Sequence, residues 1–148
     1  MVDRAVSYED LESAFDADDE HARLLELASE SPDTEALVAE LARTAHVELR
    51  AWVAHALPDL VERGAVTVDV ASSALLQIAR RDSDVDIRDE AVRSLLAVDP
   101  EAARDLVPLL RRRLNSRDYF SPVTAMWTLA TLGESSARAA IQEYGRRV

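Results

Sequence analysis

The sequence lacks cysteine and lysine altogether and has only three glycines among its 148 residues. Without cysteine, it can have no disulfides, thiolate nucleophiles or cysteine-ligated metals. So few glycines, together with five prolines, leave little punctuation for a fold of many short strands. No apolar run approaches the roughly 18 residues that a membrane-spanning helix needs, so we expect a cytoplasmic protein.

Positive charge is scarce. Seventeen basic residues, all arginine, stand against 28 acidic ones, which gives a net charge of −11 and an isoelectric point near 4.6. Nucleic acids and anionic membrane surfaces both attract proteins with a surplus of basic groups. The charge balance therefore argues against both and favours a protein partner, one of basic character. A GC-rich genome or a high-salt cytoplasm would each produce this lysine-free, acidic composition.

The residues that are abundant favour helices. Hydrophobic residues make up 48% of the chain, and alanine, leucine, glutamate and arginine, all strong helix formers, dominate it. Apolar residues recur at helical spacing in successive segments, which predicts about seven to nine helices. Gly64 and Gly133 stand where left-handed C-terminal caps are expected. Residues 65–70 alternate like a strand, but an isolated strand has no partner, so we expect a helix from about residue 68.

Three segments can be aligned with one another: residues 46–57, 84–95 and 118–129. Leu57, Leu95 and Leu129 then share one position, at separations of 38 and 34 residues. Such a period is typical of stacked helical hairpins, in which each unit buries its apolar face only against its neighbours. We therefore expect these leucines to be buried.

Residues 84–95 read Asp-x-x-Ile-Arg-x-x-Ala-Val-x-x-Leu, which resembles the second helix of a HEAT repeat. Residues 46–57 match less closely, with His46 in place of the aspartate, and in residues 118–129 Ser121-Pro122 replaces the Ile-Arg pair. The resemblance implies an all-α superhelix of stacked HEAT-like hairpins. It implies one domain over residues 1–148, with 1–32 as N-terminal capping helices and 33–148 as repeats.

In HEAT-like proteins, the aspartate and arginine of this pattern form hydrogen bonds within and between repeats. The resemblance implies that role for Asp84, Arg50 and Arg88. It is specific for architecture and says little about function, because such stacks serve many unrelated roles.

Signs of catalytic chemistry are weak. His46 and His55 lie nine residues apart, which is not the spacing of a helical metal pair, and a zinc site needs three or four ligands. The chain has no glycine-rich phosphate loop and no nucleophile elbow. We therefore expect neither an enzyme, nor a metal site, nor a cofactor.

The alignment does predict a partner-binding surface. Positions between the apolar ones face outward on the second helices and fall into three columns. These read His55, Arg93, Trp127; Trp52, Glu90, Thr124; and Glu48, Asp86, Phe120. Tryptophan and arginine are enriched at interface hot spots, so we expect partner contacts from Trp52, His55, Glu90, Arg93, Phe120 and Trp127. Alternatively, the first and last helices fold over both tryptophans and make them core.

The favoured function is protein–protein interaction, as an adaptor, inhibitor or immunity-type protein. The alternative is a nucleic-acid-associated or DNA-repair module, by analogy with HEAT-like DNA glycosylases. It would use an arginine-rich edge formed by Arg80-Arg81, Arg111-Arg112-Arg113 and Arg146-Arg147. These clusters fall near helix ends, where cations also complement the helix dipole.

Overall fold

The computed structural model describes residues 20–112 and 121–133, together with Gln142 and Arg146. The longer helices of this part are α2 (Glu20–Glu30), α3 (Thr34–Leu41), α4 (Val47–Glu62), α5 (Val68–Arg81), α6 (Val85–Val98) and α9 (Pro122–Thr131). Shorter ones are α7 (Pro100–Ala103), the 3-10 helix η1 (Arg104–Leu106) and α8 (Val107–Arg112). Their number lies within the expected range, and the described residues contain no strand, so the protein is all-α.

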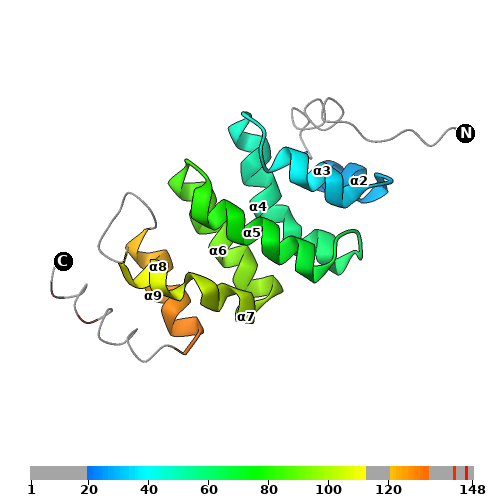
Figure 1. The fold of residues 1–148 in the computed structure, drawn as a ribbon. Helices are drawn as coiled ribbons and strands as arrows, with labels where there is room; N and C mark the ends of the chain where they lie inside the picture. Colours follow the sequence, from blue (N-terminus) through cyan, green and yellow to red (C-terminus); the bar gives the residue numbers. More distant parts are fainter. Residues whose placement is uncertain (1–19, 113–120, 134–141, 143–145, 147–148) are drawn as a thin grey trace, which may run out of the picture.

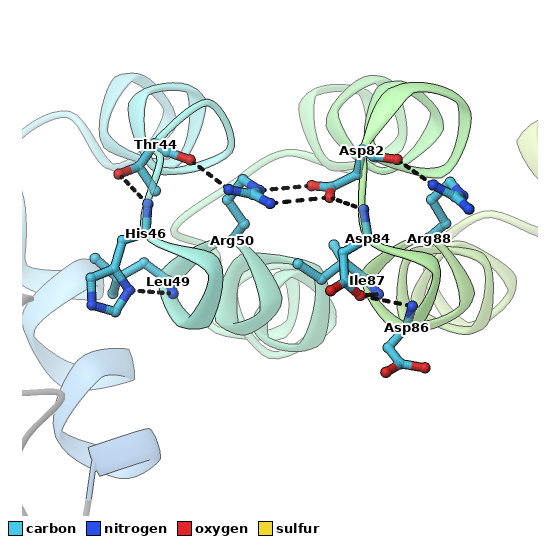
Figure 2. A network of polar contacts seen from close by, with 9 residues as sticks. All are labelled: Thr44, His46, Leu49, Arg50, Asp82, Asp84, Asp86, Ile87 and Arg88. Carbon is cyan, nitrogen blue, oxygen red and sulfur yellow. Dashed lines mark hydrogen bonds and ion pairs between the residues drawn. The ribbon is translucent and has the colours of Figure 1, made fainter. Parts of the chain in front are cut away.

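The helices succeed one another across the molecule in chain order (Figure 1). α2 and α3 lie at one end, and α8 and α9 at the other. Neighbouring helices pack in an antiparallel-like manner, and α6 makes its most extensive contacts with α5 and then with α4. Viewed close to the helix axes, α3 and α5 form one layer and α4 and α6 the other (Figure 2).

Polar residues determine where the helices start. Asp33, Thr67 and Ser121 precede α3, α5 and α9, and each accepts the backbone N–H three residues further on. His46 and Asp84, which the alignment places at one position, both cap their helices. In the third aligned segment, α9 begins directly after Ser121, so the departure from the pattern coincides with the start of that helix.

Two glycines end helices as predicted. Gly64 and Gly133 have φ angles of 75° and 71°, in the left-handed region. After Gly64 the chain turns into Thr67, the cap of α5, which confirms a helix where the alternating residues 65–70 could have suggested a strand. α4 continues through Pro58 without restarting.

The core lies between the two layers. Leu57, Leu95 and Leu129 are completely buried, as expected. In the same interior, the Ser94 hydroxyl of α6 donates a 2.5 Å hydrogen bond to the Ala54 carbonyl of α4. The bond joins the two helices at a point where an unpaired hydroxyl would be costly. Features predicted for residues 1–19, 113–120 and 134–141 lie outside the described residues.

A row of polar contacts connects one helical pair to the next. Arg50 of α4 donates through Nη1 to the Thr44 carbonyl at 2.9 Å, after the end of α3. Its Nε and Nη2 donate to the two carboxylate oxygens of Asp82, after the end of α5, at 3.0 and 3.4 Å. The two side chains are only 13% and 4% exposed, so this bidentate pair is nearly buried.

The same row continues into α6. Arg88 donates to the Asp82 carbonyl at 2.6 Å, and Asp82 Oδ1 accepts the Asp84 N–H at 3.0 Å. Arg50 and Arg88 thus each bond a carbonyl six residues before themselves, and Asp84 caps α6 (Figure 2). The expectation that Arg50, Asp84 and Arg88 form hydrogen bonds is confirmed. We call Thr44, Arg50, Asp82, Asp84 and Arg88 the Arg50 network.

Asp82→Ala should lower the free energy of unfolding by about 3–5 kcal/mol, because it leaves the Arg50 guanidinium nearly buried without its counterion. Urea denaturation followed by circular dichroism measures the change. The matched control is Asp105→Ala, which removes an exposed aspartate from η1 and should change stability by less than about 0.5 kcal/mol. Equal effects of the two substitutions would show that the pair does not hold the helical pairs together.

Candidate interaction surface

The predicted partner-binding column lies on three helices that contact one another in turn, α4 with α6 and α6 with α9. His55, Arg93 and Trp127 are all exposed, and Trp127 is the most exposed large aromatic of the described residues, at 49%. With Glu90 beside them, we call these residues the α4–α6–α9 face. The outward orientation predicted for this column is confirmed.

Glu90 joins two members of this face. His55 Nδ1 donates to Glu90 Oε1 at 2.9 Å, and the Arg93 guanidinium lies 3.8 Å from Glu90 Oε2. The three side chains are 59%, 31% and 55% exposed. Pairs this accessible contribute at most about 1 kcal/mol to stability. Their main effect is to hold the imidazole and the guanidinium in defined orientations on the surface.

Trp52 corrects the prediction. It is only 6% exposed, so the expectation of an outward indole is wrong, and the alternative in which a terminal helix covers it is right for this residue. α2 packs on α4, and the Trp52 Nε1–H donates to His21 Nδ1 of α2 at 3.2 Å. A buried indole requires such an acceptor.

This hydrogen bond also determines the tautomer of the His21 ring. An indole nitrogen can only donate, so Nδ1 of His21 accepts and the proton of the neutral ring is on Nε2. Nε2 lies 3.4 Å from the Asp59 carboxylate. The His21 ring meets the His55 ring edge to face, with centroids 5.0 Å apart. His21 and Asp59 thus extend the cluster beyond the predicted residues.

The other residues of the predicted column Trp52, Glu90, Thr124 also point toward neighbouring helices. Trp52 faces α2, Glu90 faces His55 of α4, and Thr124 is 1% exposed beside Asp89 of α6. Trp52 of α4 is thus directed at α2, Glu90 of α6 at α4, and Thr124 of α9 at α6. The column expected to face solvent is therefore a helix–helix contact, and only its middle member, Glu90, is half-exposed. Phe120, the remaining predicted contact residue, lies outside the described residues.

Asp89 connects α6 to the start of α9. Its carboxylate accepts the Ser121 N–H, at 3.2 Å to Oδ1 and 3.4 Å to Oδ2, and the residue is 7% exposed. Burial raises the pKa of Asp89, and the hydrogen bonds from Ser121 and the charge of Arg93 oppose part of that rise. The fold therefore binds a proton at Asp89 more tightly than the unfolded chain does.

A second feature lies in the other layer. A cavity of about 730 Å³ opens between α3 and α5. We call it the α3–α5 groove, lined among others by Ala39, Ala42, Arg43, Val70, Ala74 and Arg81. Sequence patterns do not predict this groove, because no motif marks the space between two helices.

Over residues 20–112 and 121–133, no three histidine or acidic side chains are grouped so that they could hold a metal ion. Within the same ranges, no helix is both long and apolar enough to cross a bilayer.

No family model matches this chain, and comparison with curated proteins and with solved structures returns no match either.

The free energy of unfolding of Asp89→Asn should increase relative to that of the native protein as the pH rises from about 3 to about 7. The stabilisation due to the protonated Asp89 is complete below the unfolded pKa and is lost as the pH rises through the higher folded pKa. Asparagine keeps an acceptor for Ser121 and carries no charge. Urea denaturation across this pH range measures the difference. Asp105→Asn, at an exposed site, is the control and should show no such gain; a gain shared by both variants would contradict the assignment to Asp89.

Proposed function

We propose that this protein is a protein–protein interaction module, an adaptor, inhibitor or immunity-type protein, that binds its partner through the α4–α6–α9 face. The observation that carries the proposal is the half-exposed indole of Trp127 on α9, with His55 exposed on α4 and Arg93 exposed on α6. A large aromatic left in solvent beside an arginine is the composition of an interface hot spot. Tryptophan also loses little conformational entropy on binding.

The contacts within the fold support treating these residues as one surface. Asp89 reaches Ser121 at the start of α9. Arg93 follows Asp89 by about one turn of α6, and Trp127 follows Ser121 by nearly two turns of α9. On the other side, His55 and Arg93 share Glu90. These contacts between neighbouring helices thus connect the segments of α4, α6 and α9 that carry the three exposed residues.

We further propose that the helical pairs are HEAT-like repeats of an α-α superhelix. Three observations support this interpretation. Arg50 and Arg88 make the same bond to a carbonyl six residues earlier. His46 and Asp84 cap α4 and α6 at the aligned position. The helices also follow one another in chain order across the molecule (Figure 1). A repeat architecture presents equivalent side chains of successive helices on one face, which is how such proteins form extended binding surfaces.

The charge of the chain indicates the chemistry of the partner. A net charge of −11 attracts a basic protein surface and speeds its approach. The same charge repels nucleic-acid phosphates. In the described residues, the arginine clusters of this alternative hypothesis stand at helix ends: Arg80 and Arg81 in the last turn of α5, and Arg111 and Arg112 at the end of α8. There they complement the helix dipole.

Trp127→Ala should abolish partner capture and leave the melting temperature nearly unchanged. The test immobilises the native protein and the variant, exposes them to lysate of the native organism and compares the bound proteins. A partner retained by the native protein and by Val68→Ala, but lost with Trp127→Ala, supports the proposal. Val68 is the matched control because it is an exposed apolar residue, 41% exposed, on α5 and away from the α4–α6–α9 face.

Two results would overturn this function. If Trp127→Ala unfolds the protein, the indole belongs to the core and not to a contact surface. If the native protein binds duplex DNA at micromolar concentration, with an affinity that falls steeply as salt is added, the nucleic-acid alternative replaces the proposal.

A further inference from the structure

The α3–α5 groove has polar contacts at both ends. At one end, near the first residues of both helices, Glu35 accepts the Thr67 N–H at 3.1 Å and the Thr67 hydroxyl at 3.2 Å. At the other, just past both helices, Arg50 joins the Thr44 carbonyl to the Asp82 carboxylate. The two helices therefore run in the same direction and are fixed to each other at their ends.

Between these ends, α3 and α5 stand apart. They are not among the helix pairs with extensive contact, whereas α5 does contact α7, the next helix of its layer. Ser72 also bonds Asp99, just before α7, at 3.1 Å. The space left between α3 and α5 is the cavity of about 730 Å³. Aliphatic side chains line its middle, Ala39 and Ala42 on the α3 side and Val70, Ala74 and Ile78 on α5, with polar side chains around them.

Charge is distributed unevenly along the groove. Arg43 and Arg81 adjoin Thr44 and Asp82, the two residues that Arg50 joins, so both guanidiniums flank the same end. Both are exposed, and neither has a partner within the described residues. Arg50 itself is neutralised by Asp82. Asp69, in the first turn of α5, lines the groove toward its other end.

We propose that the α3–α5 groove binds a segment of a partner protein that is apolar along its length and acidic at the end next to Arg43 and Arg81. The charge complementarity is local: two exposed guanidiniums adjoin an apolar wall on a chain of net charge −11. Helices and extended segments dock in grooves of this kind by burying their apolar face while polar groups at the rim set their direction. The exposed Ser73 and Gln77 supply hydrogen-bonding groups at the rim.

This site is separate from the proposed function. The groove lies in the layer of α3 and α5, whereas the α4–α6–α9 face belongs to the second helices of each pair. A protein with both could hold two partners at once. Trp127→Ala should therefore leave groove binding unchanged, so the two proposals fail or succeed independently.

The experiment uses two labelled peptides as probes. Both are short amphipathic helices with leucines on one face; one carries glutamates in its last turn, and the matched one carries lysines there. Fluorescence anisotropy measures affinity, and amide chemical shifts of the labelled full chain locate the site. The glutamate peptide should bind about tenfold more tightly than the lysine peptide, as two exposed ion pairs allow. Its shifts should cluster at α3 and α5.

Two substituted proteins sharpen the test. Arg43→Glu combined with Arg81→Glu should reverse the preference, so that the lysine peptide binds more tightly. A misfolded protein would lose both peptides and could not produce a reversal. The control, Arg23→Glu combined with Arg63→Glu, makes the same charge change at exposed arginines outside the groove lining and should retain the original preference.

Ser73→Trp provides a steric test without a change of charge. Ser73 is exposed and lines the groove, so an indole there should fill the space and weaken both peptides by at least about tenfold. The proposal is overturned if neither peptide binds at millimolar concentration, if the two bind equally, or if the shifts map to other helices.

Discussion

The ion pair between Arg50 and Asp82 is the interaction on which the arrangement of helices most depends. One apolar core runs through the helical pairs, but hydrophobic contact alone is not directional and permits many packing angles. Arg50 sets one angle by bonding the turn after α3 and the turn after α5 simultaneously. Because the two side chains are nearly buried, neither can be satisfied by water if the pairs shift.

That interaction also explains why one chain has two different surfaces. It fixes α3 and α5 at one end while Glu35 and Thr67 fix them at the other, which leaves a groove between two helices that make little direct contact. In the other layer, α4 and α6 are in extensive contact and bury their facing side chains. Their free edge carries His55 and Arg93. The closely packed helices α4 and α6 present individual side chains at the surface, whereas the separated helices α3 and α5 leave a cavity between them.

The sequence predicts the helices well, because caps and periodic apolar positions are local properties. Gly64 and Leu95 were assigned correctly for that reason. The outward column of His55 and Trp127 was also predicted, since it depends only on helical register. Trp52 was not, because its burial depends on where α2 packs, and that is a long-range choice. Asp82 was missed for the same reason: its partner lies 32 residues away.

His21 links α2 to α4 through both of its ring nitrogens. The ring nitrogen that receives the Trp52 N–H must carry no proton for the bond to exist. The other ring nitrogen faces the Asp59 carboxylate, and the ring edge meets His55, so one imidazole of α2 contacts three side chains of α4. The helix that covers Trp52 is thus held through a single side chain that α4 aligns on every side.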